Sequence, residues 1–298
     1  MTLRPRAVVV YRRTELDELL DRHSTRGQAE FFLRTRGRSL AEVQAHHDAA
    51  TDARRTVVAA LPSTWAVAQV ERDDLSRFLF APEDLVLVVG QDGLVANTAK
   101  YVSGQLVVGV DPEPGINPGV LVRHDAAGAV RLLAKLGPNA SGRIRTFSLT
   151  MAEAELDDGQ RLRALNEIYV GHHSHQSARY VIHAAGHDAR QSSSGIIVGT
   201  GTGATGWCAS IARDRGGRTL PKPTDALLTW FVREAWPSPA TDVQLTEGLL
   251  GPADRLVLTA SSDQLVVFGD GIETDRLDLS WGQDATVHIA PDRLRLAA

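Results

Sequence analysis

The chain has few of the residues from which disulfides, thiolate metal sites and lysine-based chemistry are built. Among its 298 residues there is one cysteine, Cys208, so no intramolecular disulfide can form and a cysteine-rich zinc module is excluded. Only three lysines occur, Lys100, Lys135 and Lys222. Arginine therefore carries nearly all of the positive charge, and few lysines are available for a catalytic role.

Long apolar runs and an excess of basic charge are also lacking. No segment approaches the roughly 20 consecutive apolar residues that are needed to cross a bilayer. The apolar stretch after Arg6 is too short for the core of a signal peptide, so we expect a soluble cytoplasmic protein with no membrane partner. The 32 Lys and Arg residues are outnumbered by 36 Asp and Glu, a net charge of −4, which disfavours nucleic acid as a partner.

The remaining composition is typical of a globular chain with one large domain or two ordinary ones. Hydrophobic residues make up 43% and charged residues 23%, which excludes a disordered or fibrous chain. Short β-branched apolar runs alternate with helical patterns in the first 122 residues, which predicts a parallel sheet with helical crossovers. The strand patterns lie at 6–11, 66–70, 84–90 and 105–110, and the helical patterns at 28–33 and 40–60.

The pattern changes near residue 122. One amphipathic helix is expected from Ala126 to Leu136. From Arg143 onward, many short strand patterns are punctuated by Gly, Asp and Ser, which predicts a β-rich, sandwich-like domain. We therefore expect an α/β domain over residues 1–122 and a β-rich domain over residues 123–284, in close contact.

The first candidate site is the turn Gly90-Gln91-Asp92-Gly93, directly after the strongest strand pattern. Glycines there allow a tight turn and close approach of a ligand, and ligands bind at this edge of an open parallel sheet. A carboxylate held at this edge can accept a proton from a hydroxyl nucleophile. An ordinary Asp-Gly turn explains the same residues, so both interpretations stay open.

The second candidate is a glycine-rich loop, residues 199–206, which precedes Trp207 and reads GTGTGATG. An apolar strand pattern lies before it and a helical pattern lies after it. Unhindered backbone N–H groups and a helix N-terminus suit a phosphate. The loop is not a P-loop, because no Gly-Lys-Ser/Thr follows, and it does not match the dinucleotide motif GxGxxG. A glycine-lined turn is the alternative.

Two further pairs are ambiguous by themselves. Asn166-Glu167 lies inside the strand pattern ALNEIYVG and needs partners if it is buried, although a solvent-facing strand end is the simpler explanation. Asp270-Gly271 follows the strand pattern QLVVFG and is, in isolation, a hairpin turn signal. Neither pair indicates a function without the rest of the chain.

Three histidines, His172, His173 and His175, lie within four residues. No carboxylate stands at a matching spacing, and the segment lacks the i, i+4 arrangement of a helical zinc site. We therefore expect a polar hydrogen-bonding loop near a ligand rather than a metal site.

Taken in this order, the motifs resemble those of the NAD kinase family over nearly the whole chain. That family has a Gly-Gly-Asp-Gly turn after a strand, an Asn-Glu pair, a Thr-rich glycine loop and a late Asp-Gly. The corresponding residues here are 90–93, 166–167, 200–207 and 270–271. The mitochondrial-type branch and its bacterial relatives, some described as sugar kinases, look most similar. The segments that carry this likeness are STRGQAEFFLRTRG, VVGVDPEPGINPGVL, ALNEIYVG, GTGTGATGW and FVREAWPS.

The resemblance implies an α/β nucleotide-binding domain and a β-rich NAD-binding domain with the site in the cleft. It also implies that a C-terminal tail, from about residue 285 to 298, returns to the first domain. The implied reaction transfers the γ-phosphoryl group of ATP to the adenosine 2′-hydroxyl of NAD. Mg²⁺ is expected to arrive with ATP, with no metal held by the protein itself. The implied partners are NAD and ATP, in a homodimer or higher homo-oligomer.

The resemblance assigns roles to individual residues. Asp92 matches the carboxylate that removes the hydroxyl proton. The positions matched to the phosphates of the donor are Gly90, Gln91, Gly93, Thr200, Gly201, Thr202 and Gly203. The positions matched to NAD are Asn166, Glu167, Thr205, Trp207, Ser210 and Asp270.

The sequence departs from the family pattern in three places. Gln91 stands where the family has its second glycine, and its side chain either crowds the triphosphate or hydrogen-bonds to it. Ser194 stands where the bacterial branch often has Asp, and the bacterial loop TPTGSTAY is here TGTGATGW. The last two changes favour the mitochondrial-type pattern.

Two other functions fit the same scaffold. One is a non-catalytic nucleotide sensor in which Gln91 blocks turnover. The other is a lipid-type kinase, which the Asn-Glu pair and the lack of a basic amphipathic stretch disfavour. The choice between NAD and NADH, and between ATP and polyphosphate, stays open.

Overall fold

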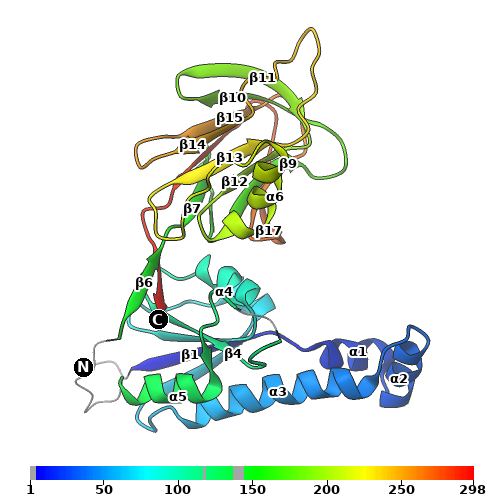
Figure 1. The fold of residues 1–298 in the computed structure, drawn as a ribbon, viewed down its shortest axis with the longest axis vertical. Helices are drawn as coiled ribbons and strands as arrows, with labels where there is room; N and C mark the ends of the chain where they lie inside the picture. Colours follow the sequence, from blue (N-terminus) through cyan, green and yellow to red (C-terminus); the bar gives the residue numbers. More distant parts are fainter. Residues whose placement is uncertain (1–4, 117–118, 137–143) are drawn as a thin grey trace. The chain divides into compact units, whose positions relative to one another are not determined.

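The computed structural model describes residues 5–116, 119–136 and 144–298, and it divides the chain into two compact units. Unit 1 comprises Met1–Phe147 with Arg295–Ala298, and unit 2 comprises Ser148–Leu294 (Figure 1). The division falls later than the expected boundary at residue 122. The reason is that the helix after residue 125 packs its buried face, including Leu132 and Leu133, onto the sheet of unit 1. Residues 117 and 118, part of the family-like segment VVGVDPEPGINPGVL, and Arg143, the expected start of the strands, lie outside the described residues.

A seven-stranded sheet forms the centre of unit 1. Its strands run in the order β2-β1-β3-β4-β19-β6, with β5 paired to β4. Their bounds are β1 Arg6–Tyr11, β2 Ala66–Glu71, β3 Leu85–Val89, β4 Leu106–Asp111, β5 His124–Asp125, β6 Thr146–Leu149 and β19 Leu294–Ala297. Strands β1 to β5 pair in parallel, as the alternating patterns predict. All five residues of β3 are buried, because a parallel sheet is covered on both faces.

Helices cover the two faces of this sheet. α3 (Leu40–Ala59) and α5 (Ala126–Ala134) lie on one face, and α4 (Asp92–Ala99) lies on the other (Figure 1). α1 (Glu15–His23) and α2 (Arg26–Arg34) pack on the first turns of α3 instead, around a small core of their own that includes Leu16, Leu33 and Val43. This helical hairpin follows β1 directly, because a capping box at Thr14 starts α1. A 3-10 helix, η1 (Arg72–Arg77), follows β2.

The chain returns to unit 1 only with its last residues. β19 pairs in parallel with β4, and the N–H of Ala298 donates to the carbonyl of Arg145 at 2.9 Å. The segment that belongs to unit 1 begins at Arg295 rather than near residue 285, because β18 (Asp284–Ile289) pairs with strands of unit 2.

Unit 2 is a sandwich of two six-stranded sheets in which neighbouring strands are antiparallel. The orders are β11-β10-β15-β18-β7-β8 and β14-β13-β12-β9-β16-β17. The bounds of the other strands are β7 Ala152–Leu156, β8 Arg161–Ala164, β9 Glu167–His172, β10 Ala178–Ala184, β11 His187–Ser193, β12 Ile196–Gly199, β13 Leu228–Val232, β14 Glu247–Leu250, β15 Leu256–Ala260, β16 Leu265–Gly269 and β17 Ile272–Leu279. Alternate apolar residues of both sheets form one core. The prediction of an α/β domain followed by a β-rich sandwich is confirmed.

Alternation along β9 places polar and aromatic residues on the outside of the sandwich. Ile168 and Val170 face the core between the sheets. Glu167 and Tyr169 belong to the opposite face, where α6 (Trp207–Asp214) packs against a smaller apolar cluster. A 3-10 helix, η2 (Gly203–Thr205), precedes α6. Among the described residues, no helix is both long and apolar enough to span a membrane.

Candidate functional site

The turn after β3 holds Gln91 in an ordinary backbone conformation. The N–H of Gly90 donates to the carbonyl of Val110 at 3.0 Å, and a Cβ at Gly90 would lie 2.9 Å from the Leu94 side chain. Gln91 is the N-cap of α4 with φ −100° and makes no side-chain capping hydrogen bond. A negative φ is open to any residue, so the change from the glycine of the family leaves the backbone unstrained.

Asp92, the first residue of α4, is held firmly by its neighbours. Its Oδ2 accepts the N–H of Val120 at 2.7 Å, and its Oδ1 accepts those of Leu121 at 2.8 Å and Val122 at 2.9 Å. A carboxylate has about four acceptor positions, so roughly one stays open to a hydroxyl group. These hydrogen bonds with residues 120–122 were not expected from the sequence. They also give Asp92 a structural role.

A cavity of about 250 Å³ opens beside Asp92 in unit 1. Gln91 and Gly93 line it together with Asp111 and Glu113, which follow from the carboxyl end of β4. The cavity therefore lies at the carboxyl ends of parallel strands, where ligands of open sheets bind. Gln91, Asp92 and Gly93, three consecutive residues of the first candidate site, line this cavity, and their roles toward a substrate stay predictions.

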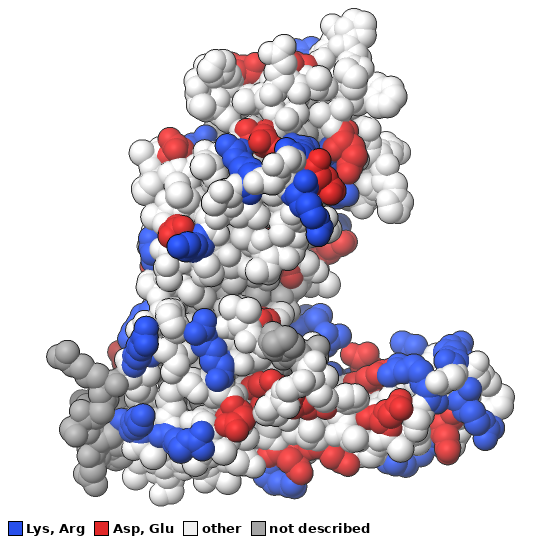
Figure 2. Space-filling model, in the orientation of Figure 1, with Lys and Arg blue, Asp and Glu red and all other residues white. Residues whose placement is uncertain are grey.

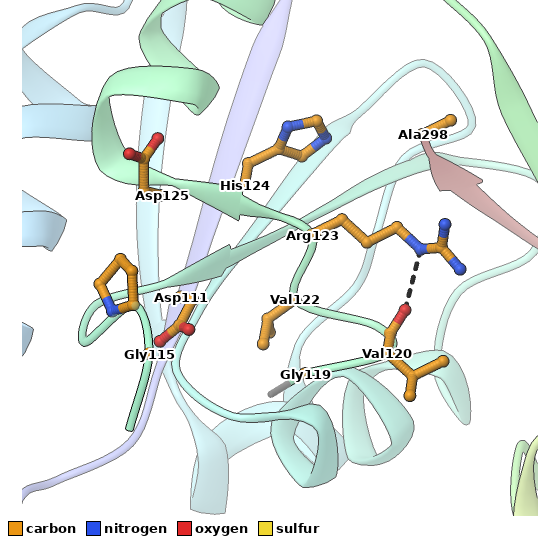
Figure 3. Close-up of a pocket in the computed structure, with 10 residues that line it drawn as sticks. Asp111, Gly115, Gly119, Val120, Val122, Arg123, His124, Asp125 and Ala298 are labelled. Atoms are coloured by element: carbon orange, nitrogen blue, oxygen red, sulfur yellow. Dashed lines mark hydrogen bonds between the residues drawn. The ribbon is translucent and has the colours of Figure 1, made fainter. Parts of the chain in front are cut away.

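A wider hollow of about 620 Å³ lies farther along the same strand ends (Figure 3). Asp111, His124 and Ala298 line it, and the Nε of Arg123 donates to the carbonyl of Val120 at 2.8 Å. Burial, followed by the charge of Arg123, lowers the pKa of His124. None of the residues that the resemblance matched to a role lines this hollow, which shares Asp111 with the Asp92 cavity.

In unit 2, Asp270 joins the hairpin between β16 and β17 to the Asn-Glu pair. Its carboxylate accepts backbone N–H groups from Leu165 at 2.8 Å, Asn166 at 2.6 Å and Glu167 at 3.3 Å. Asp270 and Gly271 have φ values of 54° and 69°, as a tight left-handed turn requires. The structure thus brings together two pairs that were ambiguous by themselves.

The carboxyl group of Glu167 has a perturbed pKa. Burial, and then the charge of Asp270, raises the pKa of Glu167 to about 7. Desolvation disfavours the charged form, and a nearby like charge adds to the effect. Perturbed acids of this kind gather at functional sites, although structural networks also produce them.

The glycine-rich loop is packed tightly against its surroundings. Thr200 is fully buried, and its Oγ1 donates to the carbonyl of Leu165 at 2.5 Å. The same oxygen accepts the N–H groups of Thr202 at 3.0 Å and Gly203 at 3.4 Å. These two N–H groups are thus engaged within the protein.

The glycines of this loop are required by close contacts. A Cβ at Gly201 would lie 2.0 Å from the backbone of Lys222, and one at Gly203 would lie 2.2 Å from the carbonyl oxygen of Asn166. These contacts favour the glycine-lined turn over a phosphate cradle for the first half of the loop. The phosphate-binding role of residues 200–203 stays a prediction.

The second half of the loop and the start of α6 are more open. Thr205 and Trp207 are exposed, with the Trp207 side chain 47% accessible, and Ser210 is half-buried. The guanidinium of Arg233 lies 5.4 Å from the centre of the Trp207 ring. These residues lie on the same outer face of unit 2 as Glu167.

The sequence analysis missed two aromatic residues on this face, Tyr169 and Phe268. Their rings lie 4.9 Å apart, and the Tyr169 ring lies 6.3 Å from that of Trp207. The available signal was the period of two along β9, which puts Tyr169 on the same side as Glu167. Together with Glu167, the three rings make a surface that is aromatic with an acidic end.

The histidines belong to a hydrogen-bonded strand end. His172 is buried, and its Nδ1 accepts the N–H of Ser174 at 3.1 Å. The rings of His172 and His173 lie 4.7 Å apart. His175 is exposed.

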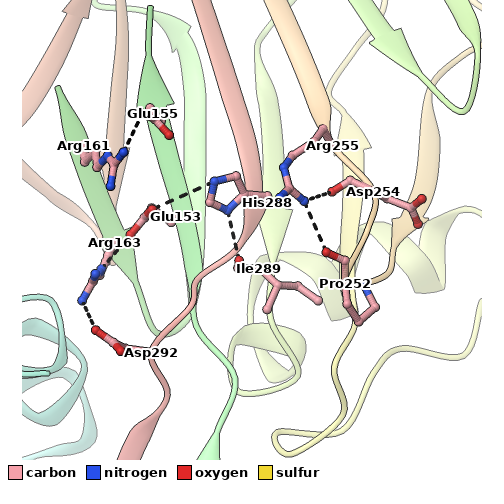
Figure 4. A network of polar contacts seen from close by, with 10 residues as sticks. All are labelled: Glu153, Glu155, Arg161, Arg163, Pro252, Asp254, Arg255, His288, Ile289 and Asp292. Carbon is pink, nitrogen blue, oxygen red and sulfur yellow. Dashed lines mark hydrogen bonds and ion pairs between the residues drawn. The ribbon is translucent and has the colours of Figure 1, made fainter. Parts of the chain in front are cut away.

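One group of metal-type ligands occurs elsewhere among the described residues, formed by Glu153, Glu155 and His288. Its carboxylates are already engaged, because Arg163 donates to Glu153 and Arg161 donates to Glu155, each at 2.8 Å (Figure 4). The arrangement is therefore an ion-pair network on the outside of the β7 sheet.

Three comparisons with known proteins were informative to different degrees, and only that with solved structures found matches. No protein-family model matches it, and no curated protein matches it in sequence. Among solved structures, the yeast NADH kinase in complex with NADH matches with a TM-score of 0.61 and 14% identity, over 100% of this chain and 84% of that one. The NAD kinase from Archaeoglobus fulgidus in complex with ATP matches with a TM-score of 0.58 and 15% identity, over 98% of this chain and 93% of that one. The chain therefore has the fold of the NAD and NADH kinases.

Proposed function

We propose that the protein transfers the γ-phosphoryl group of ATP to the adenosine 2′-hydroxyl of NAD, giving NADP and ADP. The observation that carries this proposal is the Asp92 carboxylate, held by three backbone N–H groups beside a cavity at the end of a buried strand. The fold shared with NAD and NADH kinases supports the same class of substrate.

Asp92 acts as the base in the proposed reaction. The 2′-hydroxyl oxygen attacks the γ-phosphorus, the bond from that phosphorus to the oxygen bridging to the β-phosphate breaks, and ADP leaves. The hydroxyl proton goes to Asp92. Phosphoryl transfer depends mainly on positioning and charge neutralisation, so Mg²⁺ enters with ATP as part of the substrate. Asp111 and Glu113 line the Asp92 cavity and offer the carboxylate oxygens that Mg²⁺ prefers.

We assign the binding of NAD to unit 2. Glu167 accepts hydrogen bonds from ribose hydroxyls, and Asp270 acts as a positioning residue, because its own carboxylate engages the backbone of residues 165–167. The half-exposed ring of Trp207 beside Arg233 suits a heteroaromatic ring of the dinucleotide. Asn166, Thr205 and Ser210 supply polar groups nearby in the same unit.

A direct assay tests the proposal. The purified protein is incubated with ATP, Mg²⁺ and either NAD or NADH, and the phosphorylated product is measured with an NADP-specific enzyme. We expect product with at least one of the two dinucleotides. The Asp92→Asn variant serves as the matched negative control, and absence of product from the unmodified protein would exclude the kinase function.

A non-catalytic nucleotide sensor is the second candidate. It is favoured by the three hydrogen bonds to Asp92, which give that residue a purely structural explanation. Calorimetric titration with NAD and ATP separates the two functions. Binding of both nucleotides without any product identifies the sensor.

A further inference from the structure

The ion-pair network on the β7 sheet keeps ligand atoms that its arginines do not use. It contains Glu153 and Glu155 of β7 and His288 of β18. Arg163 donates to the Oε2 of Glu153, and Arg161 donates to the Oε1 of Glu155. Each glutamate therefore keeps a second oxygen that accepts no hydrogen bond from any residue that the structure describes.

Strand register explains why these three side chains meet. β18 pairs antiparallel with β7, and His288 stands directly opposite Glu153. Glu155 is two residues farther along β7, so its side chain lies on the same face of the sheet as that of Glu153. One ligand atom from each of the three residues lies within 4.8 Å of the other two (Figure 4). Two paired strands, rather than a loop, hold this arrangement.

The imidazole of His288 is the feature that points to a ligand. The residue is only 9% exposed. Its Nδ1 lies 3.0 Å from the carbonyl oxygen of Ile289, and because a carbonyl can only accept, Nδ1 carries the hydrogen. The Nε2 of the neutral ring then has a lone pair, which has no hydrogen-bond partner within the described part of the chain and lies 4.0 Å from the Oε1 of Glu153. Two buried acceptor atoms thus face each other, and neither can donate to the other.

The contacts around these atoms are those that orient metal ligands. A metal-binding histidine usually donates its other N–H to a carbonyl or carboxylate, and ligating carboxylates are themselves hydrogen-bonded. His288 has such a partner in Ile289, and Glu153 has one in Arg163. Zn²⁺ binds imidazole nitrogen and carboxylate oxygen at about 2.0–2.2 Å, so a cation between Nε2 and Oε1 fits their 4.0 Å separation. The side chain of Glu155, 36% accessible, has room to approach the same point.

The charge of the surroundings also permits a cation. The network in Figure 4 contains carboxylates and guanidinium groups, namely Glu153, Glu155, Asp254 and Asp292 against Arg161, Arg163 and Arg255. Its formal charge is therefore −1 while His288 is neutral. On the face of unit 2 that Figure 2 shows, acidic and basic side chains likewise lie beside one another. Exposed pairs of that kind indicate no ligand by themselves, whereas Glu153 is only 2% exposed.

We propose that Glu153, Glu155 and His288 form a binding site for a divalent transition-metal cation of the Zn²⁺ type. Three protein ligands leave a fourth position for water, and the bound cation links β7 to β18. Imidazole together with carboxylate suits Zn²⁺ better than Mg²⁺, which prefers oxygen ligands alone. None of the residues that we assign to NAD or to the phosphate donor belongs to this site, so the inference does not rest on the proposed function.

The binding test uses the full chain without nucleotide, after dialysis against a chelator. Isothermal titration calorimetry and the melting temperature are measured with Zn²⁺ and with Mg²⁺. We expect Zn²⁺ to bind and to raise the melting temperature, because a ligand that binds only the folded state stabilises it. His288→Gln and Glu155→Gln should each weaken Zn²⁺ binding by at least about tenfold, since even the loss of an outer partner of a ligand costs that much. Mg²⁺ should bind far more weakly.

Two exposed histidines of unit 2 provide the controls. The Nδ1 of His187 lies 3.0 Å from the carbonyl oxygen of Ala185, so it makes the same kind of local contact as His288. His187 belongs to no group of metal-type ligands among the described residues. His175 lies in the histidine-rich segment 172–175, which is another place where Zn²⁺ can bind. His187→Gln and His175→Gln should leave the Zn²⁺ affinity and the rise in melting temperature unchanged.

Glu155→Gln keeps the test decisive if the buried ring of His288 is needed for folding, because the Glu155 side chain is partly exposed. Equal Zn²⁺ affinity in Glu155→Gln and in the two control variants would overturn the proposal. So would Zn²⁺ binding that is lost in His175→Gln and kept in Glu155→Gln, because the histidine-rich segment would then hold the cation. Absence of any Zn²⁺-dependent rise in the melting temperature of the unmodified protein, or Mg²⁺ binding as tight as that of Zn²⁺, would reject the site as well.

Discussion

Asp270 and Glu167 are joined by two hydrogen bonds, one donated by the backbone N–H of each residue. The N–H of Asp270 donates to the carbonyl of Glu167 at 3.0 Å, and the N–H of Glu167 donates to Oδ1 of Asp270 at 3.3 Å. This pairing holds the charge of Asp270 near the Glu167 side chain, and together with burial it raises the pKa of Glu167 to about 7. Glu167 is therefore divided between acid and carboxylate at neutral pH.

The affinity for NAD should consequently depend on pH. The carboxylate form of Glu167 is the better acceptor for ribose hydroxyls, so kcat/KM for NAD is expected to rise between pH 6 and pH 8, with a midpoint near the pKa of about 7. Glu167→Gln cannot ionise and should remove this dependence. The measurement is kcat/KM for NAD across the range at saturating ATP. An unchanged profile in Glu167→Gln would assign the titration to another group.

Glu167→Gln should also separate the two substrates. Loss of a charged acceptor costs roughly 1.5–3 kcal/mol, so the KM for NAD is expected to rise about tenfold or more. The KM for ATP should change little, because Glu167 belongs to unit 2 and the proposed donor site to unit 1. Initial rates with each substrate varied in turn measure the two constants. Equal effects on both would place Glu167 outside the NAD site.

Asp92→Asn is expected to abolish phosphoryl transfer, because removal of a general base lowers a rate by about 10² to 10⁴. An amide keeps one oxygen for the N–H groups of Leu121 and Val122, but it opposes its NH₂ group to the N–H of Val120. The fold should persist with a loss of about 1–3 kcal/mol of stability. Denaturant titration measures this loss separately from single-turnover rates. Near-normal turnover would rule out Asp92 as the base.

Gln91→Gly tests whether the Gln91 side chain favours or hinders the binding of the phosphate donor, ATP. The backbone of Gln91 is unstrained and its amide has no partner within the described residues, so we expect it to donate to a phosphate oxygen. The glycine variant should then weaken the use of ATP by roughly 1–2 kcal/mol. Steady-state kinetics with varied ATP measure the change. A gain in kcat/KM would show that Gln91 crowds the triphosphate instead.

Gly203→Ala tests the packing of the glycine-rich loop. Its Cβ would lie 2.2 Å from the carbonyl oxygen of Asn166, so the loop and the Asn-Glu pair must separate. We expect a loss of about 1–3 kcal/mol of stability, as for other overpacked sites. Gly206→Ala is the matched control, because its nearest neighbour would be 3.7 Å away. Equal thermal stability of the two variants would contradict the close packing.

Much of the fold was accessible from local sequence. The buried strands β1 and β3 are continuous apolar runs, and a proline ends the helical pattern that becomes α3. The position of Gln91 and Asp92 at a strand end also follows from local pattern, because Gly90 directly follows the apolar run. The boundary of unit 1 could not be predicted from local pattern, because it depends on whether the apolar face of α5 packs on the core of unit 1 or of unit 2.

Local sequence pattern is enough to predict most of the elements and the candidate residues, whereas the contacts that those residues make depend on the tertiary structure. Periodicity and turn chemistry act over a few residues, so they located Asp92, Glu167 and Asp270. The N–H partners of Asp92 lie 28 to 30 positions away, and those of Asp270 lie 103 to 105 positions away. The sequence around an aspartate does not show which distant N–H groups its carboxylate will accept. The pKa of Glu167 likewise depends on burial, which arises only when the sandwich folds.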